Sequence, residues 1–492
     1  MVYLLLIGHE IKNDITELIK VFFPREDIIM IESIEEYIAE GILIINSLYE
    51  NDRNIFTTTK LYINNSLVSQ STENINHIET YLYDKEKNIR IGIKKSLYDG
   101  LIALSDNKIP WGILTGIRPV KIVHDLLDKG IREDEILKVL SKEYKLYKDK
   151  AQLILDVGKK QRKYIEPLDK KRYSLYVSIP FCPTRCLYCS FPALPIIPYG
   201  HIIKEYVSKV ILEIESIREL MEGKKINSVY IGGGTPTSIP QIDLEKLINA
   251  IYDKFGEENI KEFTVEAGRP DTITEEYLKM LNKNKISRIS INPQTMNDKT
   301  LQLIGRKHNA EDIVKTYYLA KDIGFNTINM DLIIGLPNEG IEDVNNTLDK
   351  IKKLDPENLT VHTLSVKRGS RFKGTIDQYH IQGQNIVEEM LNKTVDYSKE
   401  MGLEPYYLYR QKQILGNFEN IGYCKPETEC IYNIAIMEEK ETIMAAGMGS
   451  VSKIFFPEEN RIERVPNFKD IKEYLERNEE LIRKKTIILE YN

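Results

Sequence analysis

Several features that would define a protein class are scarce or missing in this 492-residue sequence. Its five cysteines, an odd number in so long a chain, are too few for a disulfide framework. The net charge of −6 shows no excess of positive charge, so non-specific binding to nucleic acid is not expected. Repeats at solenoid spacing and low-complexity tracts are also lacking. These absences argue against disulfide-stapled, repeat and general nucleic-acid-binding proteins.

Long hydrophobic runs are missing as well. The opening apolar run at residues 2–8 is shorter than a signal-peptide core or a membrane span, and no small-residue cleavage site follows it. It predicts a buried strand of a cytoplasmic protein. With 42% hydrophobic and 29% charged residues, the composition is that of a globular chain, which excludes a disordered or fibrous one.

The pattern along the chain predicts three regions. Residues 1–165 mix short apolar strands with amphipathic helices, which indicates an N-terminal α+β domain of unknown role, and the charged residues 159–172 are typical of a linker. Residues 173–367 alternate strands with helices, which favours parallel βα units closed or partly closed as a barrel. Residues 368–492 are expected to be mostly helical, to cover the substrate, and to carry a solvated basic helix end at 483–485. The strands of the middle region are expected to begin near Ser174, Asn227, Glu262, Ile286, Asn326 and Asn358.

One helix of the barrel region is well marked. Its apolar residues recur at helical spacing, Asp243 can cap its start, and Gly256 can end it. The residues of its predicted buried face are Leu244, Leu247, Ile248, Ile251 and Phe255.

The cysteines that are present are clustered. Cys182, Cys186 and Cys189 follow the first predicted barrel strand with the spacing C-x3-C-x2-C, at the strand end where such folds carry their chemistry. Three thiolates are one fewer than a closed [4Fe–4S] site uses, so one iron would keep an open position, as catalytic metals do. A zinc site would need a fourth Cys or His, and the nearest downstream histidine is His201. The spacing therefore favours a catalytic iron–sulfur cluster over zinc or incidental thiols.

Glycine and polar residues gather at the ends of the later strands. The string G-G-G-T-P-T at residues 232–237 leaves backbone N–H groups open to a ligand, and no Walker-type Gly-Lys-Ser/Thr follows. Glu266 ends the third strand, where a carboxylate can accept hydrogen bonds from a ligand amine or hydroxyl. Gln294, Arg306 and Asp331 lie at or beyond the ends of later strands, so a ligand site is expected where these ends meet.

The cysteine motif after the first strand of a βα barrel resembles the radical S-adenosylmethionine (SAM) superfamily. The resemblance implies a partial, TIM-like (β/α)6 radical SAM barrel with a [4Fe–4S] cluster on Cys182, Cys186 and Cys189. In that superfamily SAM binds the open iron, and an electron from the cluster cleaves it into methionine and a 5′-deoxyadenosyl radical that abstracts hydrogen from the substrate.

From residue 173 to 453 the motifs resemble those of the oxygen-independent coproporphyrinogen III oxidase family. The strings at 114–119 and 406–412 resemble its N-terminally extended branch, the coproporphyrinogen dehydrogenases of anaerobically growing bacteria. The resemblance implies that Tyr176, Gly233 and Glu266 contact SAM. It also implies further SAM-binding positions, including those for a second SAM, at Tyr188, Gly234, Thr235, Gln294, Arg306 and Asp331.

The same resemblance implies an oxidoreductase of anaerobic porphyrin and haem biosynthesis, acting through the SAM-derived radical. It would convert two propionates of coproporphyrinogen III into the vinyl groups of protoporphyrinogen IX. The implied partners are the tetrapyrrole and an electron donor such as flavodoxin or ferredoxin, with no nucleic acid and no membrane span.

Two departures from the best-studied branch leave an alternative open. Phe191 stands where that branch has a further cysteine, and Ser178 stands where it has a histidine. The C-x-F ending is shared with a sister branch of haem chaperones, whose C-terminal histidine is replaced here by Tyr432. Haem delivery, with His362 as a candidate ligand, or radical SAM chemistry on another substrate, are the alternatives.

Some C-terminal residues fall outside these motifs. Cys424 and Cys430 are expected to be buried as small hydrophobic side chains. Arg410 and Lys412 either pair with tetrapyrrole propionates or lie on a solvated surface.

Overall fold

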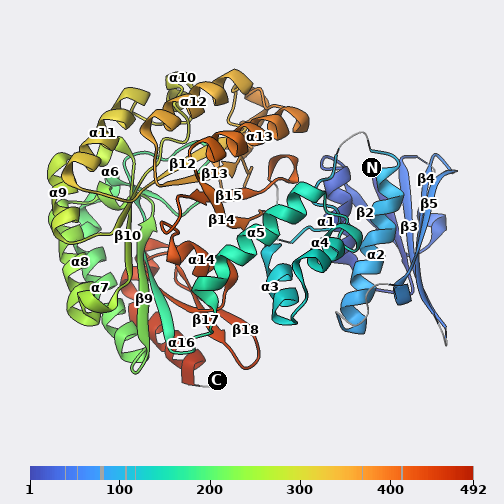
Figure 1. Cartoon of the computed structure of the whole chain (residues 1–492), viewed down its shortest axis with the longest axis horizontal. Helices are drawn as coiled ribbons and strands as arrows, with labels where there is room; N and C mark the ends of the chain where they lie inside the picture. Colours follow the sequence, from blue (N-terminus) through green and yellow to red (C-terminus); the bar gives the residue numbers. More distant parts are fainter. Residues whose placement is uncertain are drawn as a thin grey trace. The chain divides into compact units, whose positions relative to one another are not determined.

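The computed structural model describes residues 1–38, 40–51, 54–77, 83–105, 108–116, 118–367, 369–411 and 414–490. The chain forms two compact units, Met1–Gly158 and Lys159–Asn492, called here the N-terminal unit and the C-terminal unit (Figure 1). Within the motif strings considered above, Ile117 and Lys412 lie outside the described residues.

The N-terminal unit is built on a mixed sheet with the strand order β2-β1-β3-β4-β5. Strand β1 is parallel to both of its neighbours, and β4 and β5 continue the sheet antiparallel. The strands are β1 (Val2–Ile7), β2 (Ile28–Ile31), β3 (Ile42–Glu50), β4 (Ile55–Ile63) and β5 (Ser66–Asn74). The helices are α1 (Lys12–Phe22), α2 (Lys85–Ile102), α3 (Val120–Asp128), α4 (Glu133–Lys142) and α5 (Lys148–Ile165), and α5 continues past Gly158 into the C-terminal unit.

This region confirms one expectation and corrects another. The opening apolar run is strand β1, and Val2 and Leu4 are fully buried in it. The predicted linker at 159–172 is wrong in its first half, because residues 159–165 continue helix α5. The charged residues there form one side of an amphipathic helix whose other side is buried.

The C-terminal unit contains an eleven-stranded sheet in the order β14-β15-β13-β12-β11-β10-β9-β6-β16-β17-β18. Its six central strands are parallel. Each of these strands corresponds to one of the predicted strands. The sheet runs from β14 to β18 and does not close on itself within the described residues, so the prediction of a partial βα barrel is confirmed. The six strands are β6 (Arg172–Ile179), β9 (Lys225–Gly233), β10 (Glu262–Gly268), β11 (Arg288–Ile291), β12 (Ile328–Ile334) and β13 (Asn358–Thr363).

The helices that follow these strands cover the outer face of the curved sheet, with α7, α8, α9 and α11 side by side in Figure 1. The predicted helical pattern is α8, whose buried residues are those predicted, and Gly256 ends it with φ +77°. Pro240, rather than Asp243, occupies the N-cap, and Asp243 lies in the first turn. These helices are α6 (Ile196–Tyr199), α7 (Ile203–Leu220), α8 (Gln241–Phe255), α9 (Glu275–Lys283), α10 (Asp298–Leu303), α11 (Ala310–Ile323) and α12 (Ile341–Leu354). Two short strands, β7 (Phe181–Cys182) and β8 (Leu194–Pro195), pair with each other.

The last region is less helical than expected, because five strands join the barrel sheet. Strand β15 pairs antiparallel with β13, and β16 pairs parallel with β6, so the otherwise unpaired edges of the barrel strands are covered. The strands are β14 (Glu404–Tyr409), β15 (Asn420–Cys424), β16 (Thr442–Ala446), β17 (Val451–Phe456) and β18 (Arg461–Pro466). The helices are α13 (Gln384–Glu400), α14 (Ile431–Glu438), α15 (Ile471–Glu476) and α16 (Asn478–Glu490).

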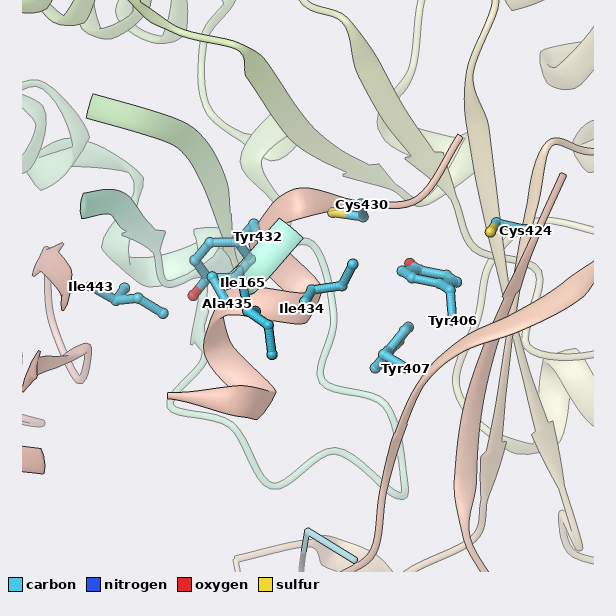
Figure 2. Close-up of a cluster of buried hydrophobic side chains, with 9 residues drawn as sticks. All are labelled: Ile165, Tyr406, Tyr407, Cys424, Cys430, Tyr432, Ile434, Ala435 and Ile443. Atoms are coloured by element: carbon cyan, nitrogen blue, oxygen red, sulfur yellow. The ribbon is translucent and has the colours of Figure 1, made fainter. Parts of the chain in front are cut away.

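Helix α14 lies on the inner side of the sheet, where it contacts β9 and β14 (Figure 1). Its residues pack with Tyr406 and Tyr407 of β14 and with Ile443 of β16 in one hydrophobic cluster (Figure 2). Cys424 and Cys430 belong to the same cluster and are 0% and 2% exposed, so their predicted burial is confirmed.

Helix α16 is held by a buried ion pair. Lys485, expected at a solvated helix end, is instead completely buried and pairs with the equally buried Glu213 of α7. Glu213 also accepts hydrogen bonds from the backbone N–H of Gly447 at 2.9 Å, from Asn467 at 2.7 Å and from Tyr474 at 2.7 Å. The prediction of a solvated helix end was wrong for Lys485 because this residue points inward from the helix. Its neighbour Lys484 is exposed, as the prediction stated.

Candidate active site

A cavity of about 560 Å³ lies at the carboxyl ends of the barrel strands. All residues that the sequence predicted for the site line this cavity, although they come from six different stretches of the chain. They are Tyr176, Cys182, Cys186, Tyr188, Cys189, Gly233, Gly234, Thr235, Glu266, Gln294, Arg306 and Asp331.

The cysteine loop, residues 182–189, is fixed against the glycine-rich turn that follows β9. Gly234 donates its N–H to the carbonyl of Ile179 at 2.7 Å, and Thr235 donates to that of Phe181 at 2.8 Å. A Cβ atom on Gly234 would lie 2.9 Å from the sulfur of Cys182, so only glycine allows this approach. The triple-glycine string thus lets the turn pack directly on the first cysteine.

The three thiols suit a bound group that is larger than a single ion. Burial raises the pKa of Cys182 to about 11 and also raises that of Cys189, so these thiols need a positive partner to become thiolates. Among the described residues, no group of three or more His, Cys, Asp or Glu side chains is gathered closely enough to hold one metal ion. An iron–sulfur cluster, which spans several ångströms and supplies positive iron, fits this donor set.

Glu266 and Tyr230 are two polar residues that line the cavity and contact each other. The hydroxyl of Tyr230 donates to the Glu266 carboxylate at 2.6 Å. Burial raises the pKa of Glu266 to about 7, the hydrogen bond from Tyr230 lowers it, and the nearby Asp331 raises it. The carboxyl group is therefore poised between its neutral and charged forms near neutral pH.

Three nearly parallel tyrosine rings, including that of Tyr230, stack next to Glu266. The rings of Tyr230 and Tyr432 are 4.5 Å apart between centroids, and Tyr176 lies 5.8 Å from Tyr432 and 6.2 Å from Tyr230. Tyr432 comes from α14 and is only 7% exposed (Figure 2). The stack therefore ties α14 to the barrel strands that carry the cavity.

Arg306 and Asn292 present unsatisfied polar atoms in the same cavity. Arg306 donates to the carbonyl of Asn292 at 2.8 Å and to the hydroxyl of Tyr188 at 3.2 Å. Its Nε and the side-chain oxygen of Asn292 are buried and make no hydrogen bond within the described chain. Buried polar groups left in this way are the kind that a ligand completes.

On the β12–β13 side, Asp331 accepts a hydrogen bond from Asn329 at 2.7 Å. The imidazole of His362 has its Nε2 3.8 Å from Asp331 and its Nδ1 3.1 Å from the hydroxyl of Tyr409. His362 is thus a polar residue of the cavity wall, as its position at the end of a strand suggested.

The structure adds lining residues that sequence reasoning missed. Arg269 directly follows the strand that carries Glu266, so the strand-end rule could have identified it. Tyr230 and Tyr407 lie inside their strands, where the sequence carries no distinguishing signal. Arg410, expected at a propionate or in solvent, is buried and donates to the carbonyl of Asn417 at 2.8 Å.

Comparison with known proteins places this site in a class. Residues 176–351 match the family model of the radical SAM superfamily. The fold resembles that of coproporphyrinogen III oxidase HemN from Escherichia coli, a radical SAM enzyme, with a TM-score of 0.52 and 21% identity over 65% of this chain and 71% of that one. The site and the fold are those of a radical SAM protein, which implies a [4Fe–4S] cluster and SAM as cofactors.

More specific relatives define the family. The oxygen-independent coproporphyrinogen-III oxidase-like protein HemZ of Bacillus subtilis is 44% identical over 385 residues, which are 77% of this chain and 77% of HemZ. The heme chaperone HemW of the same species is 31% identical over 238 residues, which are 47% of this chain and 62% of HemW. The chain belongs to the family of oxygen-independent coproporphyrinogen-III oxidase-like proteins within the radical SAM superfamily. No helix in the described part of the chain is both long and apolar enough for a membrane crossing.

Proposed function

We propose that the protein oxidatively decarboxylates two propionates of coproporphyrinogen III to the vinyl groups of protoporphyrinogen IX without oxygen. The observation that carries this proposal is the gathering of all the family's motif residues around one cavity in a chain 44% identical to HemZ. The cavity of about 560 Å³ offers room beyond the motif residues for part of a large substrate.

In this proposal each part of the cavity has a role. Cys182, Cys186 and Cys189 hold the cluster, and the turn at Gly233 and Gly234, which lines the cavity and packs on Cys182, borders the amino-acid end of SAM. When bound, the cluster and SAM supply the one-electron chemistry that removes a hydrogen atom from a propionate. The protein's own contribution is to orient the ligands and to exclude water from the reacting carbon, which the tyrosine stack supports.

Glu266 is expected to bind SAM rather than to build the cluster, because its carboxylate faces the cavity from β10 and not from the cysteine loop. We expect Glu266→Ala to weaken SAM binding about tenfold while iron content stays unchanged. Equilibrium dialysis with SAM and iron analysis of the reconstituted protein would measure both. Glu275→Ala, at an exposed carboxylate in α9, is the control. Unchanged SAM affinity in Glu266→Ala would refute the role.

The raised pKa of Glu266 also predicts a pH dependence. Below its pKa of about 7 the carboxyl group is neutral, and above it the charged carboxylate can attract an ammonium group of the ligand. We therefore expect SAM affinity to rise as the pH rises through about 7. Tyr230→Phe removes a hydrogen bond that lowers this pKa, so the midpoint should move to higher pH.

The measurement is the dissociation constant of SAM between about pH 6 and about pH 9. Tyr432→Phe is the matched control, because it keeps the ring in the same stack and Glu266 receives its hydrogen bond from Tyr230. A flat profile in the unsubstituted protein, or the same shift in both variants, would contradict this prediction.

Anaerobic turnover tests the function itself. The protein, with its cluster reconstituted, is mixed with reductant, SAM and coproporphyrinogen III, and 5′-deoxyadenosine and tetrapyrrole masses are followed. Two successive losses of a carboxyl group, coupled to deoxyadenosine, are the expected result. Deoxyadenosine with an unchanged tetrapyrrole would keep the radical chemistry and discard this substrate.

Haem delivery is the second candidate, favoured by the 31% identity to the heme chaperone HemW and by the C-x-F ending at Phe191. Tyr432 stands at the position of the chaperone histidine. Its side chain is buried in the tyrosine stack, so little of it is accessible to a haem iron. His362 is the histidine that lines the cavity. Stoichiometric haem binding without either turnover product would support delivery.

A further inference from the structure

The cavity wall carries several cations, and most of them are already paired. Arg269 makes a two-pronged contact with Asp271, at 2.9 and 2.8 Å, and also donates to Thr184. Arg306 donates to Asn292 and Tyr188. Arg185 donates to the carbonyl of Gly369 at 2.7 Å. Lys367 also lines the cavity. Its ammonium group contacts no hydrogen-bond acceptor and no carboxylate among the residues that the structure describes.

The backbone around Lys367 is well held, so its side chain enters the cavity from a defined place. The carbonyl of Lys367 accepts hydrogen bonds from the N–H and the hydroxyl of Ser370, at 3.0 and 2.8 Å. Arg185 reaches Gly369, and the N–H of Phe372 donates to the carbonyl of Leu187 at 3.0 Å. The segment after β13 is thus fastened to the cysteine loop.

The ammonium group of Lys367 has no carboxylate partner in the described chain, and the Cys189 sulfur is the nearby group that favours its charge. The Nζ of Lys367 lies 5.9 Å from the ring of Phe191, which is 62% exposed at the cavity rim. Burial lowers the pKa of Lys367, and the Cys189 sulfur is the group nearby that raises it. Arg185 stands close to the same sulfur, and its Nε is buried without a hydrogen bond in the described chain. A partly desolvated cation of this kind favours an anionic ligand.

Lys367 lies apart from Gly233, Gly234 and Glu266, whereas Asp331, also assigned to SAM, is on the neighbouring strand β12. Lys367 follows β13, whereas Gly233 and Gly234 lie on or just after β9 and Glu266 lies on β10, three to four strands away in the sheet order. An anion at Lys367 is therefore expected to belong to a molecule other than the SAM held by Gly233, Gly234 and Glu266.

We propose that Lys367, supported by Arg185, binds a carboxylate of the substrate on the Cys189 side of the cavity. This inference rests on the proposed function, whose substrate carries propionate carboxylates. It makes Lys367 a specificity-determining residue that selects a polycarboxylate tetrapyrrole, with the exposed ring of Phe191 as the apolar surface beside the bound carboxylate.

The test is equilibrium binding of coproporphyrin III to the reconstituted protein with SAM present, followed by porphyrin fluorescence. Lys367→Met keeps the apolar stem and removes the charge, so the dissociation constant should rise about tenfold or more. Lys367→Arg should stay within about threefold of the unsubstituted protein. Lys373→Met, at an exposed lysine of the same segment, is the matched control and should change nothing. The tetramethyl ester of coproporphyrin III should bind the unsubstituted protein and Lys367→Met equally.

Two further readouts separate the explanations. The reduction midpoint of the cluster is measured in Lys367→Met and in the unsubstituted protein, because Lys367 interacts electrostatically with the Cys189 sulfur. A changed midpoint with unchanged porphyrin affinity would mean that Lys367 serves the cluster, and the proposal would be wrong. Turnover of coproporphyrinogen III that proceeds with unchanged KM in Lys367→Met would overturn the carboxylate site alone. An unsubstituted protein with neither porphyrin binding nor turnover would overturn the proposed function, and this site with it.

Discussion

Cys186→Ser is expected to abolish the iron–sulfur absorbance and all cleavage of SAM while leaving the fold intact. Cys186 lies in the middle of the cysteine loop, and the backbone N–H of Cys189 donates to its carbonyl at 3.2 Å, which serine would preserve. Serine replaces the sulfur with a poorer ligand for iron, so the loop would keep its shape but lose a metal bond. Iron content, visible absorbance and deoxyadenosine formation after reconstitution are the measurements.

Cys424→Ser is the matched control for this experiment. Cys424 is completely buried in β15, within the hydrophobic cluster of Figure 2. It lies outside the cysteine loop at residues 182–189. Its replacement should leave iron content and SAM cleavage unchanged. Retention of the full iron–sulfur absorbance in Cys186→Ser would contradict the assignment of the loop as the cluster site.

Lys485→Met is expected to destabilise the protein by about 3–5 kcal/mol, because it leaves the buried carboxylate of Glu213 without its cation. Adding Glu213→Gln should recover part of that loss, since a neutral amide oxygen can still accept hydrogen bonds from Gly447 and Tyr474. Urea unfolding followed by circular dichroism would give the change in free energy.

The neighbouring residue supplies the control for this prediction. Lys484 pairs with Glu480 on the surface at 3.0 Å, and both side chains are more than a third exposed. Lys484→Met should therefore cost less than about 1 kcal/mol. Equal unfolding free energies for the two single variants would show that the buried pair contributes no more than a surface pair does.

Local patterns explain why so much of the barrel could be predicted. The starts of all six barrel strands lie within two residues of the predicted positions, because parallel strands buried on both faces are short, apolar and bounded by helices. The site residues could be predicted because motifs at successive strand ends are brought together by the barrel itself. The C-terminal strands were missed because β15 and β16 become strands by pairing with β13 and β6, which are distant in the sequence.

The sequence by itself determined the barrel strands, the cysteine spacing and the order of the motifs that point to SAM chemistry. Each of these depends on residues that are neighbours in the chain, so spacing alone carries the information. Only the tertiary structure decided that Lys485 is buried against Glu213, 272 residues away, and that Tyr432 stacks on Tyr230. The same is true of Lys367, whose ammonium group faces the cavity without a carboxylate partner in the described chain. Burial and pairing of this kind depend on which distant surfaces meet, and no local pattern records that.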